Sequence, residues 1–429
     1  MSHHDVLVVG TGMAGLAAAV RLAQSGARVG VLAKGVGATH LGGATIDVLG
    51  YAPERIERPG EALAGFVAEH PEHPYARVGA PRMAAALDWF KALLDGSPLA
   101  PYAYVGSLDE NLLLPTAIGV PKPSALAPVT MAGGDLRALE AVLAVGFRGL
   151  KDFHPALLAD GLERTWPTID ARATELRLDV EGRPEFNALG LARAFDRRDF
   201  RRTVIAQLSS RVRPAEAVAF PAALGIAAPH DVWSELEHGL GRPVFEVPTL
   251  PPSVPGMRMF AILREALRRA GGTLRLNNVV VGAEHEHGRV CALRVRVGLR
   301  EERHTADWVV LATGGFASGG LELDSSWRAR ETALGLPMAG VPEPGSPRFD
   351  PQYFADHPLA RAGVAVDARL RPLGADGEPA FENVLVAGAT LAGAEPWREK
   401  SGDGVSLATG HAAAELVLAA TTTAREAIA

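Results

Sequence analysis

The N-terminal segment constrains this chain most, because a short apolar strand runs directly into a glycine-rich turn and then into an alanine-rich helix. The strand covers residues 5–9, and a second strand is expected at residues 28–32. In a G-x-G-x-x-G turn the first glycine permits the tight turn, the second lets the backbone approach a pyrophosphate, and the third lets the helix pack on the strand. The positive end of the helix dipole then faces the anion. The residues expected to surround a dinucleotide here are Gly10, Gly12, Met13, Ala14 and Gly15.

The end of the second strand lacks the acidic residue that binds the ribose hydroxyls in many dinucleotide sites. It carries Lys34, and no acidic residue follows until Asp47. The adenosine half of a cofactor is therefore held differently or is absent. We expect Lys34 to lie beside the cofactor, followed by a functional glycine-rich loop over residues 35–45 that contributes Thr39, Gly42 and Gly43.

The composition excludes several classes of function. A net charge of -6 over 429 residues gives no basic footprint for nucleic acid and no polybasic membrane anchor. Cys291 is the only cysteine, so the chain alone builds no disulfide framework and no thiolate metal cluster, and we expect no metal site. No apolar run reaches the roughly 18 residues of a membrane-spanning helix, and the early first strand leaves no room for a signal peptide. Any membrane association would come through a partner.

Two later segments convert the nucleotide signal into a flavin signal. A helix at residues 257–270, short strands forming a β-meander to about residue 305, and a buried strand from Trp308 follow in the order seen in flavoproteins of the glutathione-reductase type. There a second glycine turn approaches the cofactor near its pyrophosphate. The residues predicted to do so here are Ala312, Thr313 and Gly314.

The third glycine segment lies near the C-terminus. A strand at residues 384–387 ends at Gly388, and a helix begins at Gly404 with Val405 and Ser406. The N-terminus of that helix would stabilise the negative charge that a flavin acquires on reduction. These residues are therefore predicted to contact the flavin ring.

Together these segments predict an α/β protein with a Rossmann-like FAD/NAD(P)-binding fold of the glutathione-reductase type. Because the chain exceeds the usual size of a single core, a second α/β or α+β domain is expected as an insertion. We assign residues 1–82 and 256–429 to a discontinuous flavin-binding domain and residues 83–255 to an inserted cap or substrate domain.

The chain resembles the B-subunit of anaerobic glycerol-3-phosphate dehydrogenase from its first strand to its last helix. The most specific segment is Thr-Leu-Pro-Pro-Ser-Val at residues 249–254, supported by residues 312–320 and 363–372. The resemblance implies a flavin-dependent subunit in the oxidation of sn-glycerol 3-phosphate to dihydroxyacetone phosphate. It also implies two partners, which are a larger flavin-containing A-subunit, and an iron-sulfur C-subunit that passes electrons to quinone. The protein would then be cytoplasmic, or held at the inner face of the cytoplasmic membrane through a partner.

The identity of the flavin stays open at this point. The family's B-subunit is described as an FMN protein, whereas an intact G-x-G-x-x-G turn suits the pyrophosphate of FAD. The chain also departs from the family near residues 395–403, where a charged cluster replaces small residues close to the expected flavin face. Transfer of electrons to the larger flavin subunit in the family's manner is less secure for that reason.

Four residues are candidates for chemistry on a small anionic substrate. Arg258 begins a helix, where its guanidinium could grip a phosphate or carboxylate. His40, in the glycine-rich loop, is a candidate base. Arg398 and Lys400 could bind the substrate or stabilise the reduced flavin. The His285-Glu286-His287 run resembles a metal site but is better explained as an exposed hairpin tip.

Two alternatives to the B-subunit function follow from the same residues. One is a stand-alone flavin dehydrogenase or fumarate-reductase-like enzyme acting on a small anionic substrate. The other is a non-catalytic assembly subunit that keeps the fold and binds no flavin. Retention of a flavin by the purified protein separates the last alternative from the two enzymes.

Overall fold

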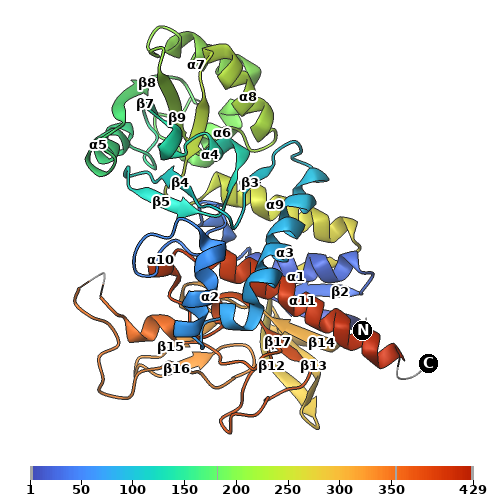
Figure 1. The fold of residues 1–429 in the computed structure, drawn as a ribbon. Helices are drawn as coiled ribbons and strands as arrows, with labels where there is room; N and C mark the ends of the chain where they lie inside the picture. The colour runs from blue at the N-terminus through green and yellow to red at the C-terminus, as the bar shows by residue number, and fades with distance from the viewer. Residues whose placement is uncertain (1–2, 181, 353–354, 427–429) are drawn as a thin grey trace.

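The computed structural model describes residues 3–180, 182–352 and 355–426 of the chain. They form two α/β units, each built on its own sheet, that follow one another along the long axis of the molecule (Figure 1). The first sheet has the order β11-β2-β1-β14-β13-β12, with β17 also paired to β14. Its strands are β1 (His4–Val9), β2 (Val29–Leu32), β11 (Thr273–Arg275), β12 (Asn278–Glu286), β13 (Arg289–Val297), β14 (Arg300–Leu311) and β17 (Val384–Val386).

The centre of this sheet is parallel, because β1 pairs in parallel with both β2 and β14. Three helices cover it: α1 (Met13–Gln24) packs against both α9 (Val254–Arg269) and α11 (Gly402–Glu426) (Figure 1). The side chains of β1 from Val6 to Val9 are buried, as expected for a strand covered on both faces. The predicted Rossmann-like fold is confirmed.

The last strand of the meander and the strand predicted from Trp308 are one element. Residues 300–305 of β14 pair antiparallel with β13, and residues 306–311 pair in parallel with β1. Sequence periodicity predicted two separate strands here because the burial of β14 changes along its length. Its side chains are exposed at Arg300–Arg303 and buried at Val309–Leu311. β14 therefore connects the meander directly to the edge of the first sheet at which β1 ends.

The second unit, called the inserted unit below, is built on a four-stranded parallel sheet of order β10-β9-β7-β8. Its own hydrophobic cluster runs from Leu136 to Val254, which confirms the expected second α/β unit. The elements are β7 (Ala141–Phe147), β8 (Asp170–Leu176), β9 (Glu216–Pro221), β10 (Val244–Val247), α5 (Pro155–Thr165), α6 (Ala188–Phe195), α7 (Arg198–Leu208) and α8 (Pro229–Leu240).

The boundary predicted at residue 83 does not coincide with the division between the two cores. Helix α3 (Tyr75–Asp95) packs on α11, and its buried Met83, Leu87 and Phe90 belong to the first hydrophobic cluster together with Tyr104. The helical period of α3 shows which face is buried but not which core buries it. The packing therefore places residues 83–104 with the flavin-binding unit.

Short elements join and flank the two units. They are α2 (Pro59–Glu69), β3 (Tyr104–Gly106), β4 (Leu112–Pro115), β5 (Pro121–Ser124), β6 (Leu126–Pro128), α4 (Val129–Ala132), β15 (Leu321–Leu323), β16 (Ala329–Glu331), α10 (Pro396–Glu399), and the 3-10 turns η1 (Ala38–His40), η2 (Leu136–Ala138), η3 (Phe316–Ser318), η4 (Pro358–Arg361) and η5 (Gly388–Thr390).

The hairpin between β12 and β13 turns at His287 and Gly288, whose φ angles are 48° and 73°. His285, Glu286 and His287 are exposed, as the hairpin-tip interpretation predicted. Among the residues that the structure describes, no cluster of His, Cys, Asp and Glu is arranged to hold a metal ion. Within the same residues, every helix is too short or too polar to cross a membrane.

Candidate functional site

A cavity of about 460 Å³ opens at the carboxyl ends of β1, β2, β14 and β17, the edge where open α/β sheets bind their ligands. It brings together the three glycine segments that lie far apart in the sequence. The predicted cofactor residues that line it are Gly10, Gly12, Met13, Ala14, Lys34, Thr39, Gly42, Ala312, Thr313, Gly314, Gly388 and Ser406.

The turn between β1 and α1 has the geometry of a phosphate-binding turn. Gly10 has a φ of 116°, and a Cβ there would lie 2.1 Å from the carbonyl oxygen of Ala312. A Cβ on Gly15 would lie 2.2 Å from the carbonyl oxygen of Gly10. At Gly12, by contrast, no described atom lies within 4 Å of the Cβ position, so this glycine faces open space. The first and third glycines close the turn, and the second exposes it to a ligand.

The N-terminus of α1 is ready to receive an anion. Within the described residues, no side chain caps Gly12 and the first turn carries no acidic residue. The first N–H groups of α1 and the positive end of its dipole are therefore available to an anion, because no carboxylate of the first turn competes for them. These N–H groups fit the pyrophosphate of a dinucleotide.

Four predicted cofactor residues do not line this cavity. Gly15 lies behind the turn, Gly43 lines a neighbouring cavity, and Val405 is buried in the first core. A Cβ on Gly404 would lie 2.7 Å from the carbonyl oxygen of Asp47. These four residues allow close packing around the cavity, whereas Asp403 and Ser406 of the same helix face it.

The neighbouring cavity, of about 130 Å³, separates the glycine-rich loop from the inserted sheet. Successive loop residues alternate between the two spaces, because Gly42 and Ala44 line the large cavity while Gly43 and Thr45 line the small one. The small cavity is lined by Gly43, Thr45, Leu114, Pro115, Thr116, Lys122, Met131, Glu246 and Pro248. Among these residues Lys122 is the one cationic side chain.

Lys122 belongs to a hydrogen-bonded network beside the loop. Its Nζ donates to Thr45 Oγ1 at 2.6 Å and to Asp47 Oδ2 at 2.8 Å, and the Ser124 hydroxyl donates to Asp47 Oδ1 at 2.7 Å. Burial and, to a lesser extent, the charge of Asp47 raise the pKa of the neighbouring Asp403 to about 7, against the opposing effect of Lys122. A carboxyl group that titrates near neutral pH is suited to move protons.

Sequence reasoning missed both Lys122 and the role of Asp403. Lys122 lies in a proline-rich connector without a clear period, and its partner Asp47 is 75 residues away in the chain. Asp403 stands between two glycines that seemed the important positions. No local sequence signal joins these two residues, because only the tertiary fold brings them to one place.

The expectation that Arg258 grips a substrate anion is wrong. Its side chain is 0% exposed, and its guanidinium donates to both carboxylate oxygens of Glu246 and to the carbonyl oxygen of Gly225. Arg258 sits in the first turns of α9, as predicted, but faces the inserted sheet and not solvent. Its charge serves the contact between the two units.

The other three chemical candidates are dispersed. His40 packs edge-on against Phe260, with ring centroids 5.0 Å apart, outside the residues lining the cofactor cavity, and burial lowers its pKa. Lys400 donates to the carbonyl oxygen of Trp397, and burial lowers its pKa. Arg398 lines a separate cavity and pairs with Glu395. The structure does not bring these three residues together.

The fold and the glycine-lined cavity define a flavin-binding oxidoreductase. The chain matches the FAD binding domain family over residues 5–405 and belongs to it. Relatives that align over nearly the whole chain define a narrower family. One of them, the B-subunit of anaerobic glycerol-3-phosphate dehydrogenase from Pectobacterium carotovorum, is 32% identical over 97% of this chain and 98% of its own length. The chain is a member of that B-subunit family, which confirms the resemblance seen in the sequence.

Similar relatives occur in distant organisms. The B-subunit of Yersinia pestis is 33% identical over 96% of this chain and 98% of its own length. A protein of Halobacterium salinarum, named as a probable B-subunit of anaerobic glycerol-3-phosphate dehydrogenase, is 33% identical over 95% of this chain and 96% of its own length. By these names the relatives are subunits of a multi-subunit enzyme.

Among solved structures, 3-ketosteroid delta1-dehydrogenase from Sterolibacterium denitrificans aligns with 98% of this chain and 100% of its own, at 14% identity and a TM-score of 0.46. A flavocytochrome c3 fumarate reductase aligns with 97% of this chain and 78% of its own, at 12% identity and a TM-score of 0.45.

Proposed function

We propose that this protein is a flavin-dependent subunit of a dehydrogenase that oxidises sn-glycerol 3-phosphate to dihydroxyacetone phosphate. The names of relatives that align over nearly the whole chain support this activity. The observation that carries the proposal is the small cavity beside the cofactor cavity, in which Lys122 is the one cation among the lining residues. A small phosphorylated alcohol has the size for this space, and its phosphate would take the place of Asp47 as the partner of Lys122.

The residues of the cofactor cavity would hold the flavin as FAD. The N-terminus of α1 would bind the pyrophosphate, with Gly12 allowing its close approach. Lys34 lines the same cavity and supplies a positive charge where other dinucleotide sites have an acid. When bound, a flavin accepts the hydride of a substrate C–H bond.

Side chains of this protein would bind the substrate phosphate and accept the substrate proton. Lys122 would bind the substrate phosphate through a charge-assisted hydrogen bond, and the hydroxyls of Thr45 and Thr116 line the same cavity. Oxidation of the secondary alcohol also releases the hydroxyl proton. Asp403 lines the cofactor cavity, so the proposal requires the alcohol end of the substrate to reach that cavity, where its carboxylate would accept the proton. A pKa of about 7 leaves a large fraction of this carboxyl group ionised at neutral pH.

The proposal includes partner subunits. The names of the relatives as B-subunits support a multi-subunit enzyme. From the family resemblance in the sequence we extend this to two further subunits, one containing flavin and one containing iron-sulfur clusters, which would receive the electrons and pass them to quinone. Through such partners the protein would associate with the inner face of the cytoplasmic membrane. Copurification of tagged protein with these two subunits from the native host tests this part of the proposal.

The activity is tested by mixing the purified, flavin-loaded protein with sn-glycerol 3-phosphate without oxygen and following the flavin absorbance. We expect bleaching with this substrate and none with glycerol, which lacks the phosphate. Lys122→Met should raise the KM more than tenfold, whereas Lys151→Met, a change at an exposed lysine of the inserted unit, should leave it unchanged. Retention of flavin with no bleaching, alone or with coexpressed partner subunits, contradicts the proposed activity.

A further inference from the structure

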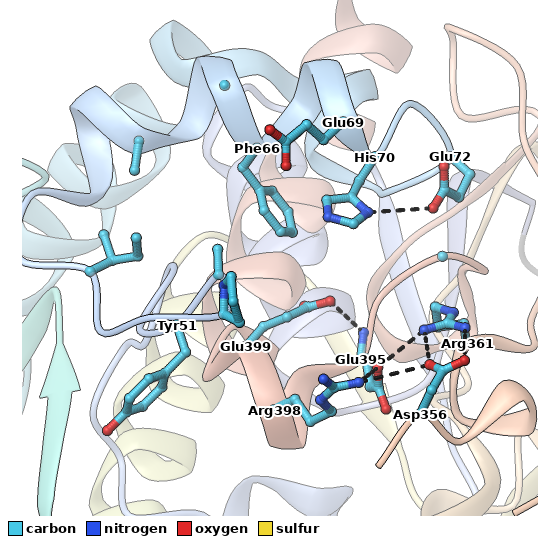
Figure 2. A pocket seen from close by; sticks show the side chains of 16 residues that line it. Tyr51, Phe66, Glu69, His70, Glu72, Asp356, Arg361, Glu395, Arg398 and Glu399 are labelled. Carbon is cyan, nitrogen blue, oxygen red and sulfur yellow. Dashed lines mark hydrogen bonds and ion pairs between the residues drawn. The ribbon is translucent and has the colours of Figure 1, made fainter. Parts of the chain in front are cut away.

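A second cavity, of about 760 Å³, lies apart from the proposed reaction site. It shares no lining residue with the cofactor cavity or with the small substrate cavity. Its walls come from α2, from the loop around Tyr51, and from the segments around Asp356 and α10 (Figure 2). Its volume is in the range of cavities that bind small organic molecules.

One carboxylate in this cavity is buried without a full set of partners. Glu395 is 4% exposed, and its Oε2 accepts from Arg361 Nη1 and Arg398 Nη1, each at 3.3 Å. Its Oε1 is buried and has no hydrogen-bond donor among the described residues. Leaving such an oxygen unpaired is costly, so a donor supplied by a ligand would be stabilising.

The lining is acidic overall. Asp356 and Arg361 are paired with one another, through a contact of 2.6 Å. The charged residues on the cavity wall are Glu69, Glu72, Asp356, Glu395 and Glu399 against Arg361 and Arg398. Five carboxylates facing two guanidinium groups create a negative potential that favours a cation.

The opposite wall offers apolar surface. Figure 2 shows Phe66 of α2 on the far side of the cavity from Glu395 and Arg398. Ile56, Pro53 and Ala62 are further apolar residues of the lining, and Gly65 leaves room beside Phe66 because no described atom lies within 4 Å of its Cβ position. A ligand that fits both walls combines a positive group with an apolar body.

We propose that this cavity is a binding site for a small organic amine, whose ammonium group donates to Glu395 Oε1 while its apolar part packs on Phe66. The site is separate from the proposed reaction and would bind its ligand whether or not a flavin is present.

The proposal is tested by isothermal titration calorimetry of the flavin-loaded protein with benzylamine and with 1,5-diaminopentane. Benzyl alcohol, which has the same ring and no charge, is the matched ligand control. We expect at least one amine to bind, with a Kd at least tenfold lower than that of benzyl alcohol. If neither amine binds, or if benzyl alcohol binds as tightly, the cavity is not an amine site.

Three variants separate a specific site from a general effect. Glu395→Gln should weaken amine binding at least tenfold, while Glu163→Gln, at an exposed acid on α5, should not change it. Because Glu395 also pairs with two arginines, Gly65→Leu provides a second variant that fills the cavity without touching a charge. It should abolish binding and leave the rate of flavin reduction unchanged. Equal binding in wild type and Gly65→Leu overturns the proposal.

Discussion

Arg258 of α9 and Glu246 of β10 form a bidentate ion pair, in which the two N–O distances are 2.8 and 3.0 Å and both side chains are 0% exposed. The pair joins a helix of the flavin-binding unit to the edge strand of the inserted sheet. Glu246 also accepts from the Thr130 hydroxyl and from the backbone N–H of Leu224. Its oxygens are therefore well satisfied, and removing either member of the pair leaves a buried charge alone.

We expect Glu246→Leu to lower the free energy of unfolding by about 3–5 kcal/mol, the usual cost of leaving one member of a buried pair unpaired. The double variant Glu246→Leu with Arg258→Met should recover much of this loss, because both charges are then absent. Urea denaturation of the single and double variants measures the difference. A double variant no more stable than the single one would show that the pair is not the source of the stability.

Gly12→Asp should abolish flavin retention while leaving the fold intact. The Cβ position of Gly12 meets no described atom within 4 Å, so the new carboxylate fits sterically but lies where the phosphates would bind. Flavin released by denaturation is quantified and identified by mass, which also distinguishes FAD from FMN. Gly96→Asp, at another glycine with open space around its Cβ position, is the control and should retain flavin. Normal retention by Gly12→Asp contradicts the assignment of this turn.

The phosphate turn could be predicted from the sequence because its requirements are local. Gly15 is needed because its backbone meets that of Gly10 five residues earlier, and Gly10 is needed for its φ of 116°; both requirements fall within six residues and leave a short motif, although Gly10 also lies against the distant Ala312. Chain order then predicted the meander and the strand that ends at Ala312. Local patterns of this kind located most of the cofactor cavity.

The substrate cavity could not be predicted in this way. Lys122 is placed by a β-hairpin in a proline-rich stretch, and its contacts to Thr45 and Asp47 span more than seventy residues of chain. Arg258 shows the opposite error, since an arginine in the first turns of an amphipathic helix resembles a solvent-facing charge until Glu246 is seen opposite it. Charged residues buried between two units carry no periodic signal, and their roles become visible only in the folded structure.

Asn383 should be the most important single amide for attaching the meander to the first sheet. It is 1% exposed; its Nδ2 donates to the carbonyl oxygens of Val290 and Asp307, and its Oδ1 accepts from the N–H of Val290. Asn383→Leu leaves these backbone groups unpaired, at about 1–3 kcal/mol for each buried group. Asn187→Ala, which removes only a helix cap on α6, should cost about 1 kcal/mol. Urea denaturation ranks the two, and a smaller effect at Asn383 contradicts the prediction.

Asp403 should make the stability of the flavin-free protein depend on pH. Burial raises its pKa from the ordinary 3.8 to about 7 in the folded protein, so the folded state binds this proton more tightly than the unfolded state does. The resulting stabilisation is fully present below about pH 4 and is lost as the pH rises to 7. Asp403→Asn should therefore flatten the pH dependence of the unfolding free energy across this window. Asp160→Asn, at an exposed acid on α5, should leave the dependence as it is in wild type.

The same carboxyl group should control the reaction of the flavin-loaded protein. If Asp403 accepts the substrate hydroxyl proton, the rate of flavin reduction by sn-glycerol 3-phosphate rises with pH through about 7 as the carboxyl ionises. In Asp403→Asn the rate should fall at least a hundredfold and lose this rise, because general base catalysis is typically worth a factor of about 10² to 10⁴. Stopped-flow measurement of the absorbance change between pH 5.5 and 8.5 tests both effects. A variant that is slow but keeps the wild-type pH profile would assign the proton transfer to another group.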